Sequence, residues 1–288
     1  MPPRISIVIP SLTGDVERAR ASCLRQTIQD WELITVTGIR PVGRARNMGV
    51  ARASSDLILF LDDDAEVGNE QVLERMIAAM DASDIAVVGT SKILPATSSR
   101  LQRRIAREVP RWEFPVLDEL TESNPPLDRY GYGAATTTCC LIRRSVLDEL
   151  GGFDERLPTG QDTELFYRIR LAGYRFVIPA GCWTYHNPPG TLRGLLLKCF
   201  RYGVGHARES RLEPGRRMDL LPLDRTWGRL ATAIAPLMFP ASLFLDIRLL
   251  PSFHVRPAFR PIQAIARLAT LVGYIWGFAT WRFVPRRG

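Results

Sequence analysis

Three consecutive carboxylates, Asp62, Asp63 and Asp64, directly follow the apolar run 57–61. An apolar run that short, bounded by polar residues, predicts a strand buried on both faces. Neighbouring carboxylates repel one another, so each raises the cost of ionising the next, and a bound cation would relieve that cost. Oxygen ligands suit Mg²⁺ or Mn²⁺. The alternative is that the three acids form a polar turn and cap the helix that follows.

Further candidates for chemistry lie elsewhere in the chain. Asp162 is predicted in the first turn of a helix that runs to Ala172, where the exposed amides and the helix dipole stabilise a carboxylate. It could equally be an ordinary N-terminal acid of that helix. Arg44 and Arg46 lie in a predicted short helix and could reach a phosphate, or could belong to a solvated basic face.

The elements that must position these residues follow a strand–helix–strand order, which predicts a mostly parallel α/β sheet. The predicted strands are 5–10, 31–37, 57–61, 85–89, 136–142 and 174–178. Ligands of such sheets bind beyond the carboxyl ends of the strands, where the three acids fall. The proline-rich segment 96–129 is predicted to be a loop-rich insertion over the site.

The composition excludes several classes of protein. With 288 residues, 46% hydrophobic and 24% charged, the chain is neither disordered nor a multi-span membrane protein. Five cysteines without CxxC spacing argue against a disulfide framework and favour a reducing compartment. The N-terminus leads directly into a predicted strand, so we expect no signal peptide.

The net charge of +8 is concentrated in the C-terminal part, because residues 206–288 hold 13 arginines against 5 acidic residues. Such asymmetry favours an anionic partner, and the apolar content of this part favours a membrane surface over nucleic acid. The uncharged runs 230–245 and 268–281 fall short of the roughly 20 residues that span a bilayer. We therefore expect an in-plane or re-entrant hairpin; the alternative is a helical pair packed on the α/β domain or on a second subunit.

The ordered segments SIVIP, ARNMGVA, LILFLDDD, GGFDE and GQDTELFYRIRLAGY, followed by His186, resemble the family 2 glycosyltransferases with the GT-A fold. The resemblance covers roughly residues 4–190. It implies a Rossmann-like α/β catalytic domain at 1–190, with a mostly parallel sheet flanked by helices. Residues 191–288 would then form a basic, apolar, membrane-associating helical region at the cytoplasmic face of the inner membrane, peripheral or monotopic.

The resemblance also implies a reaction, in which a sugar passes with inversion from a nucleotide-sugar donor to a hydroxyl of a glycan or lipid-linked acceptor. It assigns Mn²⁺ or Mg²⁺ to Asp62, Asp64 and His186, and the role of general base to Asp162. The donor-binding residues that it implies are Pro10, Arg44, Arg46, Asn47, Asp62 and Asp63.

One departure from the family concerns the donor. The acidic pair that commonly follows the second strand is replaced by the segment 36–41, VTGIRP, so the nucleotide and sugar stay open. Alternative functions are a catalytically degenerate membrane-bound scaffold and a metal-dependent phosphatase or nucleotidyltransferase. A phosphatase would carry Asp-x-Asp-x-Thr, whereas Ala65 and Glu66 follow the acids here. The sequence also leaves open whether the protein forms a homo-oligomer.

Overall fold

The computed structural model describes residues 2–127, 133, 135–212 and 260–280. The chain divides into two compact units. The sheet unit comprises Met1–Ser98, Arg111–Leu127 and Gly131–Asn187, and the helical unit comprises Ser99–Pro110, Asp128–Tyr130 and Pro188–Gly288. The uncharged run 230–245, the first part of the expected hairpin, lies outside the described residues.

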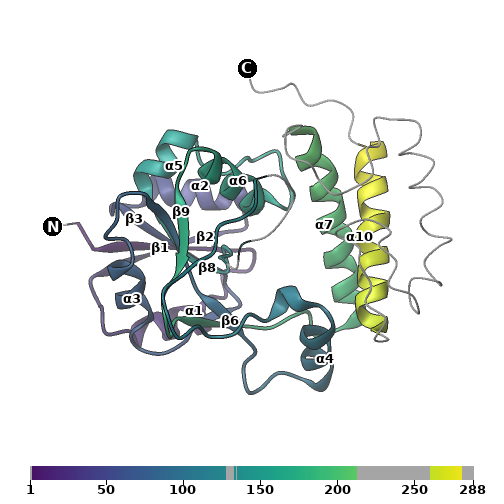
Figure 1. The fold of residues 1–288 in the computed structure, drawn as a ribbon, viewed down its shortest axis with the longest axis horizontal. Coiled ribbons are helices and arrows are strands. Elements are labelled where there is room, and N and C mark those ends of the chain that lie inside the picture. The colour runs from purple at the N-terminus through teal and green to yellow at the C-terminus, as the bar shows by residue number, and fades with distance from the viewer. Residues whose placement is uncertain (1, 128–132, 134, 213–259, 281–288) are drawn as a thin grey trace. The chain divides into compact units, whose positions relative to one another are not determined.

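The sheet unit is built on a seven-stranded sheet with the strand order β2-β1-β3-β8-β5-β9-β7. Figure 1 labels β1, β2, β3, β8 and β9 of this sheet. The strands are β1 (Ile5–Ser11), β2 (Trp31–Thr37), β3 (Leu57–Leu61), β5 (Ile85–Gly89), β7 (Thr121–Glu122), β8 (Cys139–Arg143) and β9 (Arg175–Ile178). Strand β1 pairs in parallel with both β2 and β3, as the sequence predicts. Strand β8 lies between β3 and β5 and runs antiparallel to both, so the sheet is mixed at its centre.

Helices cover both faces of this sheet. They are α1 (Glu17–Leu24), α2 (Val42–Arg52), α3 (Val72–Ala78), α5 (Arg144–Leu150) and α6 (Gln161–Leu171). Successive side chains of a strand point to opposite faces, and accordingly Ile7 and Ile9 join one buried cluster with residues of α1 and α3. Val8 joins the other cluster, with residues of α5 and α6. The predicted α/β class is therefore confirmed.

A second, three-stranded sheet brings distant segments together. It has the order β4-β10-β6 and consists of β4 (Ala65–Val67), β10 (Trp183–His186) and β6 (Ser91–Ile93). Strand β10 runs antiparallel to β4, with His186 opposite Ala65, and parallel to β6. This register places the histidine beside the residue that follows the acidic stretch.

The segment 96–129, predicted to be loop-rich, also contains a helix that the sequence pattern did not indicate, α4 (Arg100–Glu108), which is followed by the 3₁₀ turn η1 (Pro110–Trp112). Ser99 caps α4: its hydroxyl accepts from the amide of Gln102 at 3.2 Å, and the Gln102 side chain accepts from the amide of Ser99 at 2.8 Å. This reciprocal pair is a capping box, and the spacing Ser-x-x-Gln is its sequence signature. The prolines around this segment indicate loop, and they outweighed this short helix signal in the prediction.

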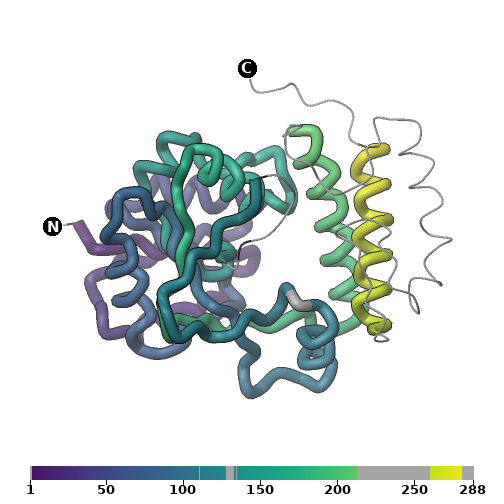
Figure 2. The backbone as a smooth tube through the Cα atoms, viewed as in Figure 1, coloured from purple at the N-terminus to yellow at the C-terminus, as the bar shows by residue number. Residues whose placement is uncertain are grey.

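The described part of the helical unit contains α4, α7 (Leu192–Leu212) and α10 (Pro261–Thr280). Helices α7 and α10 run side by side (Figure 2). Glycines make this closeness possible, because a Cβ at Gly203 or Gly273 would collide with the backbone of the other helix. At 20 residues, α10 is long and apolar enough to cross a membrane, whereas the uncharged run alone predicted a shorter segment.

A buried carboxylate from α4 caps α10. The Glu108 Oε2 atom accepts hydrogen bonds from the amides of Ile262 at 2.7 Å and Gln263 at 3.4 Å. Its other oxygen lies 2.9 Å from Nε of Arg104. A carboxylate at this position satisfies amides that have no partner within their own helix, and it interacts favourably with the helix dipole.

Candidate active site

The three acids leave the carboxyl end of β3 in a tight turn. The amide of Asp62 donates to the carbonyl of Thr138 at 3.0 Å, and the amide of Ala65 donates to the carbonyl of Asp62 at 3.1 Å. This turn leads into β4 and not into a helix. The next helix, α3, begins at Val72 without a side-chain cap, so the alternative in which the acids cap it is wrong.

Asp62, Asp64 and His186 converge at this edge of the sheet. Each offers one ligand atom, and these atoms all lie within 4.8 Å of one another. The Nε2 atom of His186 lies 3.4 Å from Oδ1 of Asp64, and the histidine is 4% exposed. Two carboxylates and an imidazole fit a divalent cation, because the carboxylates supply negative charge and the ring nitrogen Nε2 lies beside them.

Asp63 lies between these acids and contacts a different strand. It is half-buried, and burial together with the charges of Asp64 and Asp62 raises the pKa of its carboxyl, although a hydrogen bond with the Ser11 side chain lowers it. Ser11 ends β1, directly after the buried Pro10. The end of β1 and the acidic turn therefore form one continuous edge.

Arg46 of α2 belongs to the acidic cluster. Its Nη2 atom lies 2.9 Å from Oδ1 of Asp62, and the residue is 3% exposed. Its Cζ atom lies 5.5 Å from the ring centroid of Phe153. Its Nε and Nη1 atoms are buried without a hydrogen-bond partner among the described residues. The alternative prediction, that these arginines belong to a solvated basic face, is therefore wrong for Arg46. Arg44 is exposed, and its Nε atom lies 4.0 Å from Oε2 of Glu155.

Asn47 fastens the loop that leads towards Asp162. Its Nδ2 atom donates to the carbonyl of Phe153 at 2.9 Å and to Glu155 at 3.0 Å, and its Oδ1 atom accepts from the amide of Phe153 at 2.9 Å. Gly152 adopts a φ of 64°, and a side chain there would press on the Asn47 amide. The amide of Asn47 is thus engaged by this loop.

Asp162 lies in the first turn of α6, as predicted, after Gly160 with a φ of 81°. The preceding residue, Gln161, reaches α2, where a Cβ on Gly43 would lie 3.3 Å from its Cγ atom. The pKa of the buried Cys140 thiol is raised, chiefly by its burial. The charges of Asp162 and Asp62 contribute to the same rise. Both carboxylates therefore lie within electrostatic range of one residue of β8.

Trp112 is a residue of this site that sequence reasoning missed. Its indole stacks on the imidazole of His186, with ring centroids 5.9 Å apart and an interplanar angle of 15°. It is 3% exposed and ends the η1 turn. A lone tryptophan in a proline-rich segment carries no signal for such a contact.

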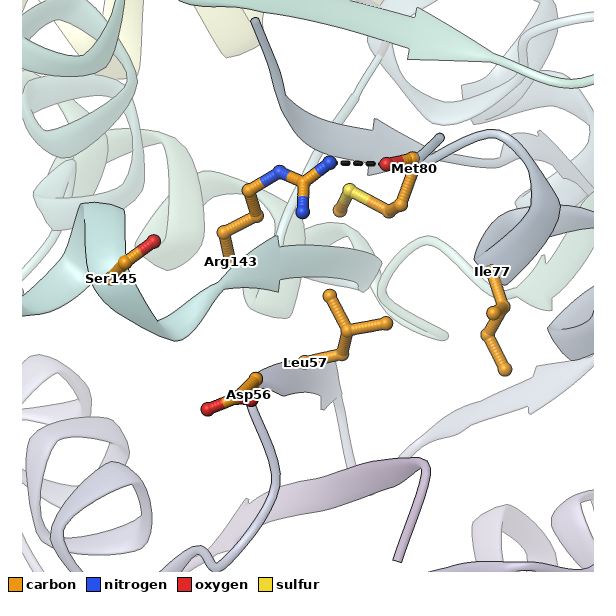
Figure 3. A pocket seen from close by; sticks show the side chains of 6 residues that line it. All are labelled: Asp56, Leu57, Ile77, Met80, Arg143 and Ser145. Atoms are coloured by element: carbon orange, nitrogen blue, oxygen red, sulfur yellow. Dashed lines mark hydrogen bonds between the residues drawn. The ribbon is translucent and has the colours of Figure 1, made fainter. Parts of the chain in front are cut away.

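A separate cavity of about 530 Å³ lies at the amino end of β3 (Figure 3). It is lined by Asp56, Leu57, Ile77, Met80, Arg143 and Ser145. Arg143 donates to the carbonyls of Met80, Ala82 and Ile85, so its guanidinium holds backbone together. This cavity is at the opposite end of the strand from Asp62.

Comparison with known proteins gives a match to one family over part of the chain and several curated relatives. Residues 40–151 match the family described as glycosyl transferase family 2. The chain is 27% identical over 204 residues to the O-antigen biosynthesis protein RfbC of Myxococcus xanthus, which covers 68% of this chain and 16% of that protein. It is 29% identical over 153 residues to the succinoglycan biosynthesis protein ExoA of Rhizobium meliloti, covering 49% of this chain and 46% of that protein.

A third relative is the O-antigen chain rhamnosyltransferase WbaN of Salmonella anatum. It is 27% identical over 168 residues, and the match covers 57% of this chain and 52% of that protein. The matches therefore span about half or less of these relatives' lengths. Among solved structures, the mannosyltransferase PcManGT of Pyrobaculum calidifontis superposes with a TM-score of 0.59 at 15% identity, covering 96% of this chain and 88% of that chain. The two share a fold.

Proposed function

We propose that this chain, whose residues 40–151 match glycosyl transferase family 2 and which shares its fold with a solved mannosyltransferase, transfers a sugar from a nucleotide-diphosphate sugar to an acceptor hydroxyl with inversion. The observation that carries this proposal is the convergence of Asp62, Asp64 and His186 within 4.8 Å at the edge where ligands of such sheets bind. A scaffold without activity would not need a buried imidazole directed at two carboxylates.

A divalent cation at Asp62, Asp64 and His186 would neutralise the charge that develops on the departing diphosphate. The imidazole nitrogen favours Mn²⁺ over Mg²⁺, which takes oxygen ligands almost exclusively. The solved mannosyltransferase of the same fold is a complex with GDP-Man and Mn²⁺, which supports this choice. We propose Pro10, Arg44 and Asp63 as donor contacts, and Arg46 and Asn47 as residues that shape the donor site through Asp62 and the 152–155 loop.

Asp162 is the proposed general base. Its carboxylate would accept the proton of the acceptor hydroxyl as the oxygen forms its bond to the anomeric carbon and the diphosphate leaves from the opposite side of the sugar. Attack from that side inverts the configuration. General-base assistance of this kind contributes about 10²–10⁴-fold to a rate.

The helical unit is proposed to associate with an anionic membrane at its cytoplasmic face. The apolar helix α10, with Val272 and Trp276 exposed, and the arginine-rich C-terminal part support this role. Relatives named for O-antigen and succinoglycan biosynthesis support a glycan acceptor, and membrane association would suit one that is linked to lipid.

Calorimetry with a panel of nucleotide diphosphates and Mn²⁺, followed by transfer assays, tests the proposal on three variants. Asp64→Ala should lose metal-dependent donor binding, because one ligand oxygen is gone. Asp162→Asn should bind donor normally and lose about 10²-fold or more of the transfer rate. The control Asp56→Asn lies at the other end of the same strand and should behave as wild type.

Each role can fail separately in this experiment. Unchanged Mn²⁺-dependent donor affinity in Asp64→Ala would exclude the proposed metal site. An Asp162→Asn enzyme that transfers sugar at the wild-type rate would remove Asp162 from the role of base. Donor hydrolysis or transfer that needs neither residue would favour a different catalytic class.

A further inference from the structure

We propose that Trp112 is a positioning residue that holds the imidazole of His186 in its metal-binding orientation; this inference rests on the metal site proposed above. Three observations support it: the state of the second ring nitrogen of His186, the geometry of the stack, and the way Trp112 is itself held in place.

The first observation concerns the Nδ1 atom of His186. A metal-binding histidine usually donates its other ring N–H to a carboxylate or carbonyl, and that hydrogen bond fixes the tautomer and the ring orientation. Here Nδ1 is buried, and no described residue hydrogen-bonds to it. The usual orienting contact is therefore missing from the described part of the chain, and another contact must restrain the ring.

The second observation is the stack. The rings of Trp112 and His186 are nearly parallel, at 15°, with centroids 5.9 Å apart, and both residues are at least 96% buried. The indole therefore lies along one side of the imidazole in a buried part of the site and limits the directions in which the ring can move. A hydrogen bond at Nδ1 would otherwise play this part, and Nε2 lies 3.4 Å from Oδ1 of Asp64.

The third observation is that Trp112 is anchored to the sheet that carries His186. Two residues after Trp112, Phe114 forms an antiparallel bridge with Lys92 of β6: its amide donates to the Lys92 carbonyl at 2.7 Å, and its carbonyl accepts from the Lys92 amide at 3.1 Å. Lys92 in turn pairs with Thr184 of β10, two residues before His186.

Cations also contact the indole. The Nζ atom of Lys92 and the Cζ atom of Arg111 each lie 6.0 Å from the centroid of the Trp112 ring. Cations at such distances are attracted to the electron-rich face of an indole. Trp112 is thus held by its backbone and by its ring, as a rigid support requires.

The test measures Mn²⁺ affinity on the full chain by electron paramagnetic resonance of the free ion. Trp112→Ala removes the support and should weaken Mn²⁺ binding about 10- to 100-fold, the loss typical of residues that orient a ligand. Trp112→Phe keeps a flat ring and should restore most of the affinity. Trp183→Phe, in the same strand as His186, is the matched control and should bind as wild type.

A second readout needs no destabilised variant. Paramagnetic Mn²⁺ should quench the fluorescence of a tryptophan stacked on its ligand. The quenched component should be present in the wild type and in Trp183→Phe and lost in Trp112→Phe, while diamagnetic Mg²⁺ leaves the wild-type emission unchanged.

The outcomes separate this inference from the proposal on which it rests. A wild-type chain that does not bind Mn²⁺ would overturn the metal site itself. A wild type that binds, together with a folded Trp112→Ala chain of equal affinity, would overturn only the role of Trp112, even if that chain melts at a lower temperature. If Trp112→Ala does not fold, Trp112→Leu provides bulk without a flat ring and must show the same weakening.

Discussion

At the scale of the residue, a buried arginine, Arg46, contacts the acidic turn. Nη2 of Arg46 lies 2.9 Å from Oδ1 of Asp62, and the guanidinium also lies over the ring of Phe153, which is 1% exposed and in edge-to-face contact with Phe60 of β3. A charge-assisted hydrogen bond of this kind fixes the direction of a carboxylate. We interpret Arg46 as a support for Asp62, where the sequence alone suggested a phosphate ligand.

Replacing Arg46 with methionine keeps the length of the side chain and removes its charge and hydrogen bond. The Arg46→Met chain should bind Mn²⁺ about 10- to 100-fold more weakly, because the Asp62 carboxylate is no longer oriented. Isothermal titration with Mn²⁺ measures the change, and Arg52→Met, exposed at the end of the same helix, is the control. Tighter Mn²⁺ binding in Arg46→Met would instead identify Arg46 as a competing cation.

The sequence predicted the members of the candidate site better than their partners. An apolar run before three acids, and an acid at a helix start, are local patterns, and both elements form where expected. The contacts of Asp62 with Arg46 and of His186 with Trp112 join segments that are distant in the chain, and no local pattern specifies them. The clamp of Asn47 on the Phe153 backbone, 106 positions away, is of the same kind.

At the scale of the element, apolar runs identified the buried strands, but the pattern did not give their direction. Strand β8 reads as any other β-type run, yet it is inserted antiparallel between β3 and β5. Helix α4 carries a weak helical pattern, because it has few apolar residues, only Leu101, Ile105 and Ala106, among charged ones. The direction of β8 is set by pairing with strands that are distant in the chain, and a local sequence pattern does not encode such pairing. The local signal for α4 is instead its capping box, the spacing Ser-x-x-Gln that begins at Ser99.

The helix pair of α7 and α10 gives a prediction at this scale. A methyl group at Gly203 would collide with the carbonyl of Thr270 and approach the amide of Tyr274. Gly203→Ala should therefore destabilise the pair by about 1–3 kcal/mol, the usual cost of overpacking, despite the higher helix propensity of alanine. Hydrogen exchange of α7 amides measures this, with Leu197→Ala, exposed on the same helix, as the control. Unchanged protection would mean that the helices do not pack this closely.

At the scale of the whole molecule, the chain combines an acidic sheet unit, which holds 17 basic and 23 acidic residues, with a basic, apolar C-terminal part. Val272 and Trp276 are 47% and 59% exposed on α10, the helix long enough for a membrane. Deleting the C-terminal part would be a poor test of anchoring, because α10 also packs on α7 and is capped by Glu108. Point substitutions on its exposed face leave those contacts in place.

Replacing both exposed residues with glutamate should release the chain from anionic vesicles. Two added negative charges at the surface oppose anionic lipids by about 1 kcal/mol each, and apolar area is lost as well, so the partition coefficient should fall on the order of 10-fold or more. Co-sedimentation with phosphatidylglycerol vesicles measures it, and Leu120→Glu, 57% exposed on the sheet unit, is the control. Equal sedimentation of both variants would count against α10 as the contact.

The cap that Glu108 provides for α10 has a consequence for biosynthesis. Its partner amide at Ile262 is 154 positions further along the chain. During translation α4 leaves the ribosome long before Ile262 is made. In that interval Arg104 is available to the Glu108 carboxylate, while the later strands of the sheet unit are still being synthesised. The last described helix therefore completes a contact whose other half, α4, is synthesised more than 150 residues earlier, and a ribosome that stalls before codon 262 yields a nascent chain in which Glu108 has not met this partner.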